Sequence, residues 1–315
     1  MSIKPLRIAF MGTPEFTIPV LEALLQSSHQ VVCVYTQPPR PSGRGNKIKR
    51  SSVHEYAAAK GIEVRTPESL KKDAKAREEF AALALDAAVI AGYGMMLPDD
   101  VLDGPRFGSL NVHPSILPRW RGTSPVQFTI WAGDEKAGVT VMRLIGKMDS
   151  GPIAAIETVP VGPKTTAPDL DRVLWPMGGR MLVAALDDLA AGKPQNYTPQ
   201  DDSLATYARL LKREDGCVDW TKTAAQIDRQ IRALNPWPGV WTLNAEGKRL
   251  KIIEAELTGE AFTEPPGTLV DRLGHIACGE DTALRLIKIQ PENAKPMDLP
   301  AALNGNYLKV DEVLG

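Results

Sequence analysis

Hydrophobic and polar positions in the first half of the chain follow two alternating patterns. Short apolar runs rich in branched or small residues predict strands, and most are followed by a segment with apolar residues at helical spacing, as at 16–27. Strands that alternate with helices predict an α/β domain built on a doubly wound, mostly parallel, Rossmann-like sheet. The predicted strands are 6–11, 30–35, 62–65, 86–93, 108–113 and 139–144.

The pattern changes after residue 206. One helical segment, 224–234, is followed by short strand-like runs that turn residues separate, which predicts a small, OB-like β-barrel. A polar, proline-bearing stretch at 192–206 is typical of a linker. We therefore predict one domain at 1–191 and a second at 207–315. The strand-like runs of the second domain are 249–255, 267–271, 275–278 and 283–289.

The composition excludes several classes of protein. The chain has 315 residues, with 37 Lys and Arg against 38 Asp and Glu, so it is not coated with positive charge, although a local basic patch for nucleic acid is compatible with this balance. The three cysteines lie far apart without CxxC spacing, which argues against a disulfide framework and against a metal site. The longest apolar region, 81–97, is too short and interrupted to span a bilayer. We expect a cytoplasmic monomer that does not bind membranes.

The segment 36–50 differs in kind from the rest of the first domain. It holds three prolines, two glycines and five basic residues, with no acidic residue among them, which predicts an exposed loop without regular structure. Such a charge run is either a solvated connector or, as its length inside a compact domain favours, a functional loop. The basic residues are Arg40, Arg44, Lys47, Lys49 and Arg50.

Asn111 and His113 stand two positions apart on a predicted strand, so both side chains leave the same face, and Pro114 ends that strand. Histidine transfers protons near neutral pH, and an asparagine amide is a suitable donor to an oxyanion. Asp149 on a neighbouring loop would orient the imidazole and favour its charged form. Alternatively, Asp149 is an ordinary turn aspartate. As a trio, these residues suit acyl transfer to an amine.

Signatures of other enzyme classes do not occur in the sequence. It contains no GxSxG elbow, no Walker A motif, no HExxH and no cluster of His and Cys ligands. The first turn, 11–14, lacks GxGxxG, which disfavours an NAD-dependent enzyme in spite of the predicted sheet.

Residues 111–122 read Asn-Val-His-Pro-Ser-Ile-Leu-Pro-Arg-Trp-Arg-Gly, and Asp149 begins Asp-Ser-Gly. This combination resembles the folate-dependent formyltransferases, which share an Asn-x-His, an SLLP-like signature and a distant Asp-Ser/Thr-Gly. Pro114 and Ile116 depart mildly from that pattern. The resemblance extends over nearly the whole chain. Within the family, the chain most resembles the members that act on methionyl-tRNA. Further matching segments are 11–16, 36–45, 91–98, 131–134, 218–220 and 232–239.

The resemblance implies transfer of a formyl group from 10-formyltetrahydrofolate to the amino group of methionyl initiator tRNA. It implies catalytic roles for Asn111, His113 and Asp149, and tRNA contacts for the five basic residues of 36–50, with Arg44 foremost. Arg119 and Arg121 stay open between structural pairing and contact with tRNA phosphates. The folate contacts that the resemblance implies are Ser115, Ile116, Leu117, Pro118, Tyr93 and Gly94.

Other functions fit part of the same evidence. A related formyltransferase could use the trio on a nucleotide-sugar or ribonucleotide amine, or a hydrolase could release formate. A noncatalytic tRNA-binding protein could keep the fold, but binding alone would not need Asn111, His113 and Asp149 together. The basic segment favours tRNA.

Overall fold

The computed structural model describes residues 4–42 and 47–315, which form two compact units. The first unit comprises Met1–Pro125, Lys136–Pro160 and Pro168–Arg209, and the second comprises Val126–Glu135, Val161–Ala167 and Leu210–Gly315. Mixed α/β structure with a large, mostly parallel sheet in the first unit and a separate antiparallel sheet in the second confirms the α/β class and a second domain built on β-structure.

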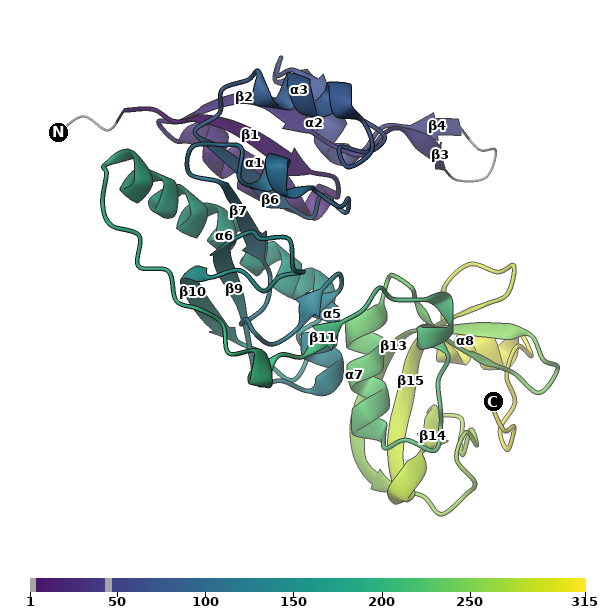
Figure 1. Cartoon of the computed structure of the whole chain (residues 1–315). Helices are drawn as coiled ribbons and strands as arrows, with labels where there is room; N and C mark the ends of the chain where they lie inside the picture. Colours follow the sequence, from purple (N-terminus) through teal and green to yellow (C-terminus); the bar gives the residue numbers. More distant parts are fainter. Residues whose placement is uncertain (1–3, 43–46) are drawn as a thin grey trace. The chain divides into compact units, whose positions relative to one another are not determined.

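A seven-stranded sheet forms the centre of the first unit (Figure 1). From β7 to β5 the neighbours run parallel, whereas β9 and β10 pair antiparallel. Every residue of β6 and β7 is buried, because helices cover both faces of the sheet. In order across the sheet, the strands are β10 (Ile153–Pro160), β9 (Lys136–Arg143), β7 (Ser109–His113), β6 (Ala87–Ala91), β1 (Arg7–Gly12), β2 (Gln30–Tyr35) and β5 (Val64–Arg65).

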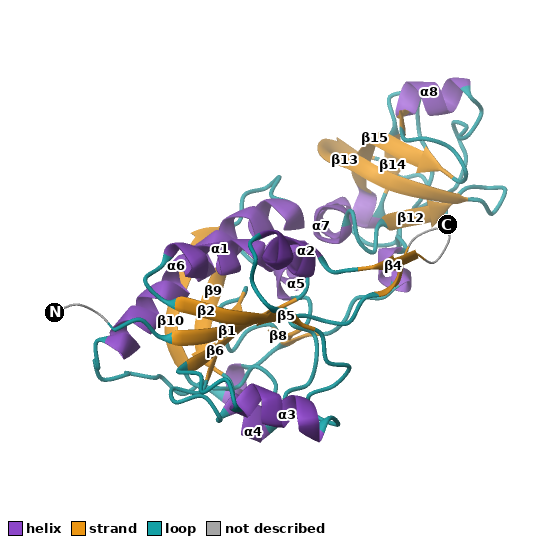
Figure 2. Cartoon of the chain, turned by 90° about the horizontal axis from the view of Figure 1, so that it is seen from above, coloured by secondary structure: helices purple, strands orange, loops and turns teal. Residues whose placement is uncertain are grey.

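Helices α1, α2 and α6 lie on one face of this sheet, and α3 and α4 lie on the other (Figure 2). The helix α6 approaches the sheet closely at Gly178, where a Cβ atom would come within 2.4 Å of Val112 Cγ1 in β7. This small residue therefore lets α6 pack directly behind the strand that ends at His113. The bounds are α1 (Ile18–Gln26), α2 (Ser52–Ala59), α3 (Ala74–Ala81), α4 (Asp99–Leu102) and α6 (Ala167–Ala190), with short 3-10 helices at Glu15–Thr17 and Asp202–Leu204.

The second unit has an antiparallel sheet in the order β12-β13-β15-β14, with β16 paired to β15. Helix α7 begins at a capping box between Thr223 and Gln226 and buries Ile227 and Ile231 against the sheet. Closure of this sheet into a barrel stays a prediction. The elements are α5 (Pro125–Ala132), α7 (Ala224–Leu234), β12 (Val240–Leu243), β13 (Arg249–Ala261), β14 (His275–Ala277), β15 (Thr282–Pro291), β16 (Met297–Asp298) and α8 (Leu299–Asn304), with 3-10 helices at Arg213–Gly216 and Gly279–Asp281.

The stretch 192–206, predicted as a linker, is hydrogen bonded within the first unit. Thr198 and Ile153 exchange backbone hydrogen bonds of 2.8 and 2.9 Å. Just beyond the stretch, β11 (Tyr207–Ala208) pairs with β8 (Arg121–Gly122). The predicted domain boundaries stay a prediction, but residues of this stretch are held beside the strand end that carries His113.

The prediction that 36–50 lacks regular structure is wrong. Strands β3 (Arg40–Ser42) and β4 (Lys47–Lys49) pair antiparallel, with Pro41 opposite Ile48. A proline fits here because a two-stranded ribbon has only edge strands, where a missing N–H donor costs no interior hydrogen bond. We call residues 40–42 and 47–50 the basic hairpin; Arg44 lies outside the described residues. Within the described part of the chain, no helix combines the length and apolar character needed to cross a membrane.

Candidate active site

The strand β7 brings Asn111 and His113 to the carboxyl edge of the large sheet, where ligands of doubly wound folds bind. Asn111 pairs with Ile90 of β6 and Met142 of β9, so it is on a central strand. Asn111 and His113 are 6% and 5% exposed. The side-chain amide of Asn111 makes no hydrogen bond to any described residue, so its donors are available to a ligand.

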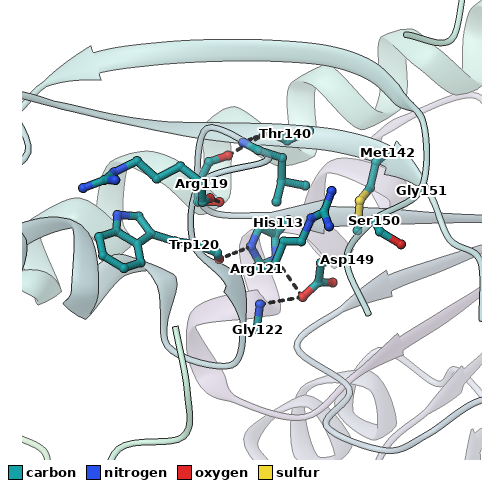
Figure 3. Close-up of polar contacts among 12 residues, drawn as sticks. His113, Arg119, Trp120, Arg121, Gly122, Thr140, Met142, Asp149, Ser150 and Gly151 are labelled. Atoms are coloured by element: carbon teal, nitrogen blue, oxygen red, sulfur yellow. Dashed lines mark hydrogen bonds and ion pairs between the residues drawn. The ribbon is translucent and has the colours of Figure 1, made fainter. Parts of the chain in front are cut away.

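The imidazole of His113 is held by one of its two nitrogens. Nε2–H donates to the carbonyl oxygen of Trp120 at 2.9 Å, and Trp120 turns that carbonyl towards the ring through a left-handed backbone, φ 63°. A carbonyl only accepts, so Nε2 carries the proton and Nδ1 is the nitrogen that exchanges protons with a substrate. Nδ1 lies 3.9 Å from Asp149 Oδ2 (Figure 3).

Asp149 belongs to the loop between β9 and β10 and has a left-handed backbone, φ 44°. Its Oδ2 accepts a hydrogen bond of 2.8 Å from the backbone N–H of Gly122. The side chain is 15% exposed, so the carboxylate is only partly screened by water. The structure therefore places the Asp149 carboxylate beside the His113 ring.

These groups together can move a proton and stabilise negative charge. An imidazole with one fixed nitrogen lies beside a carboxylate, and a free amide donor shares its strand. Such an arrangement suits attack on a carbonyl group, where an oxyanion forms and a proton must reach the leaving group.

Comparison with known proteins assigns the chain to a family. The formyl transferase family matches residues 6–186, and the formyl transferase C-terminal domain matches residues 210–307. The methionyl-tRNA formyltransferase of Paramagnetospirillum magneticum is 47% identical over 98% of this chain and 100% of its own length. That of Gluconobacter oxydans is also 47% identical, over 95% of this chain and 97% of its own length. The chain belongs to the methionyl-tRNA formyltransferase family.

Solved structures share the fold at low sequence identity. HypX from Aquifex aeolicus in complex with tetrahydrofolic acid has a TM-score of 0.63 and 18% identity; the match covers 97% of this chain and 48% of HypX. The N-formyltransferase from Helicobacter canadensis, in complex with folinic acid and dTDP-3-aminofucose, has a TM-score of 0.66 and 18% identity over 93% of this chain and all of that one. These likenesses concern the fold alone.

The segment Ser115 to Pro118, which the resemblance assigned to folate, is tied to the sheet by Thr140 of β9. The Thr140 hydroxyl donates to the carbonyl of Ser115 at 2.7 Å and accepts from the N–H of Leu117 at 3.2 Å. Ser115 and Leu117 are buried. Side chains of Ser115 and Leu117 thus face the protein, whereas Ile116 and Pro118 are only half-buried.

Tyr93 likewise points into the protein. Its ring is buried in the apolar core, and burial raises the pKa of its hydroxyl above the ordinary value, so the group stays neutral. Its backbone carbonyl accepts from Thr13 Oγ1 and from Gln37 Nε2, both at 3.0 Å. Gly94 follows with φ 71°, and a Cβ there would come within 2.6 Å of Gln37 Nε2. Only the backbone of this turn can face a ligand.

The basic residues of 36–50 are not brought to the trio by any contact of the described residues. Arg40, Lys49 and Arg50 are exposed. Lys47 belongs to β4, and Arg44 lies outside the described residues. Within the described residues, no group of His, Cys, Asp and Glu is arranged to hold a metal ion.

The two arginines left open by the sequence differ in environment. The guanidinium of Arg119 lies over the ring of Trp120, 4.3 Å from its centroid. Arg121 is fully buried and pairs with Gln200 and Asp202, so its side chain is not exposed for contact with a tRNA phosphate. Sequence reasoning missed Gln200 and Thr140, because neither belongs to a motif.

Proposed function

We propose that the chain transfers the formyl group of 10-formyltetrahydrofolate to the free amino group of methionyl initiator tRNA. The observation that carries the proposal is the Asn111, His113 and Asp149 cluster at the end of β7, in a chain 47% identical to methionyl-tRNA formyltransferases over nearly its whole length. Membership of the family supports a formyl transfer, and the cluster supports its site.

The proposed reaction forms one C–N bond and breaks another. An α-amino group titrates at about 7.7 to 8.0, so its uncharged fraction attacks the formyl carbon without a strong base. Asn111 donates its free amide N–H to the developing oxyanion, and the protonated imidazole of His113 stabilises the same charge. Nδ1–H of the protonated His113 passes its proton to the folate nitrogen as the C–N bond to folate breaks, and the neutral imidazole then takes the proton that the attacking amine gives up. Asp149, at 3.9 Å, stabilises the charged ring.

We assign substrate contacts in the same unit. Folate would meet Ser115, Ile116, Leu117 and Pro118 and the Tyr93-Gly94 turn, which adjoin the strand end of His113. The exposed cations of the basic hairpin support an anionic macromolecule as acceptor. The assigned tRNA contacts are Arg40, Arg44, Lys47, Lys49 and Arg50. We also keep a cytoplasmic monomer and an OB-like second domain as proposals.

One assay separates the candidate reactions. The chain is incubated with 10-formyltetrahydrofolate and, in parallel, with methionyl initiator tRNA, with an amino-sugar nucleotide, with a ribonucleotide amine, or with buffer alone. Mass spectrometry then measures formylated product and free formate. We expect formylmethionyl-tRNA to dominate; dominant formylation of a small amine, or formate release, would assign a different reaction, and tRNA binding without product would make the chain a binding protein.

A further inference from the structure

The guanidinium group of Arg121 is an internal charge that fixes the position of another residue. Arg121 is 0% exposed, and a buried charge is tolerated only when partners compensate it. Its Nε and Nη2 both donate to Gln200 Oε1, at 3.0 and 2.8 Å, and Nη2 pairs with Asp202 Oδ1 at 2.7 Å. Arg121 thus holds the carbonyl end of the Gln200 side chain.

The opposite end of the same side chain holds the Asp149 loop. Gln200 Nε2 donates to the carbonyl oxygen of Asp149 at 2.9 Å and to that of Gly151 at 2.7 Å. Arginine only donates and a backbone carbonyl only accepts, so the amide of Gln200 has a single orientation. Gln200 therefore links the buried guanidinium of Arg121 to the backbone carbonyls of Asp149 and Gly151, which flank Ser150.

The loop needs such a support. Asp149 has a left-handed backbone, φ 44°, a conformation that costs a non-glycine residue roughly 1 kcal/mol or more unless its surroundings hold it. Gly122, next to Arg121, holds the carboxylate through its N–H at 2.8 Å. A second tie joins Lys147 of the same loop to Asp202 at 2.5 Å. Hydrogen bonds from Lys147 and Arg121 keep the pKa of Asp202 below its ordinary value, so this partner stays charged.

We propose that Gln200 is a positioning residue, which uses the buried Arg121 as its anchor and holds the Asp149 carboxylate beside His113 for catalysis. The inference rests on the proposed function, because it concerns the same reaction. Its consequence is a separation of two roles in one side chain. The carbonyl oxygen of Gln200 satisfies the fold by accepting from Arg121, and the amide N–H groups serve the reaction by holding the loop.

Gln200→Glu tests this separation. The glutamate keeps an acceptor for Arg121 but presents a carboxylate oxygen, in place of two donors, to the carbonyls of Asp149 and Gly151. Small displacements of catalytic groups cost up to about a hundredfold in rate, so we expect kcat to fall roughly 10- to 100-fold. The KM for methionyl-tRNA and for 10-formyltetrahydrofolate should stay within about twofold, because neither substrate meets Gln200 in this proposal. The thermal midpoint should stay near that of the native chain.

Gln195→Glu is the matched control, since it makes the same chemical change five residues earlier, where the side chain donates only to the exposed carbonyl of Lys193. It should keep native kcat. A native kcat in Gln200→Glu would overturn the proposal, and so would a loss that appears only as raised KM. If Gln200→Glu does not fold, Gln200→Met decides together with Asp202→Asn. The methionine removes the donors to the loop and the acceptor for Arg121, whereas Asp202→Asn weakens the pairing of Arg121 and leaves the Gln200 donors in place, so kcat must fall further in Gln200→Met. Absence of formyl transfer in the native chain would instead refute the proposed function.

Discussion

Replacing Asp149 by asparagine separates the charge of this side chain from its hydrogen bond. The amide oxygen of asparagine can still accept from the N–H of Gly122, which Asp149 Oδ2 does at 2.8 Å. Asparagine also tolerates the left-handed backbone at φ 44°. The substitution therefore removes the negative charge beside His113 and leaves the loop geometry in place.

The distance between the two side chains sets the magnitude. His113 Nδ1 and Asp149 Oδ2 are 3.9 Å apart. At an effective dielectric constant of about 20, two unit charges at this distance interact by about 4 kcal/mol. The His113 and Asp149 side chains are 6% and 15% exposed, so solvent lowers this figure only in part. A factor of ten in rate corresponds to about 1.4 kcal/mol, and we expect formyl transfer to slow by roughly two to three orders of magnitude.

Single-turnover formylation of methionyl-tRNA, with enzyme in excess, measures this effect without product release. Asp281→Asn is the matched control, because Asp281 also has a left-handed backbone, φ 54°, and lies in the second unit. That variant should keep the native rate. A rate for Asp149→Asn within about threefold of the native chain would mean that the Asp149 charge does not act on the transition state.

Three further outcomes are expected. Burial raises the pKa of Asp171 to about 6 in the folded protein, so the folded protein loses stability as pH rises from 3.8 to 6. Asp171→Asn removes this charge and still accepts the hydrogen bond from Trp175. It should add about 2 to 3 kcal/mol to the free energy of unfolding at pH 7, measured with urea. Of the three thiols, Cys217 alone is exposed, and it should be the one that a thiol reagent modifies in the folded chain at pH 8. Alanine at the three exposed cations of the basic hairpin should raise the KM for tRNA and flatten its salt dependence by about two to three in log–log slope. Those cations are Arg40, Lys49 and Arg50.

Each of these outcomes has its own control. An unchanged pH dependence of unfolding in Asp171→Asn would show that the Asp171 carboxyl is not the group that titrates. Burial raises the pKa of Cys33 to about 11 and of Cys278 to about 12, so fast modification of either thiol would contradict the packing. For the hairpin, alanine at Lys71, Lys72 and Lys75, on another exposed surface of the first unit, should leave the KM for tRNA unchanged.

Short-range patterns in the sequence predict the relative placement of two residues well where one strand carries both. Asn111 and His113 lie on one strand, and their spacing alone puts both side chains on one face. Apolar runs likewise predict six of the seven strands of the large sheet, but not β10. The antiparallel pairing of β9 with β7 and β10 was not predicted, because strand direction depends on contacts between segments rather than on a local pattern.

The role of Gln200 and the strands of the basic hairpin could not be predicted from local sequence patterns. Gln200 bonds to the Asp149 carbonyl 51 positions earlier and to Arg121 79 positions earlier, so no local pattern marks it. Prolines and glycines in the basic segment indicate a loop, whereas Ile48 alone favours a strand, so the local pattern does not predict the pairing of Ile48 with Pro41.

The most direct measurement is the single-turnover rate constant for formylation of methionyl-tRNA by the native chain and by Asn111→Ala. Asn111 contributes the free amide that is proposed to bind the oxyanion. Loss of one such donor costs roughly two to three orders of magnitude in turnover. We predict formylmethionyl-tRNA from the native chain, a rate lower by that factor in the variant, and unchanged tRNA affinity. No product from the native chain, or equal rates for both, would contradict the proposed site and reaction.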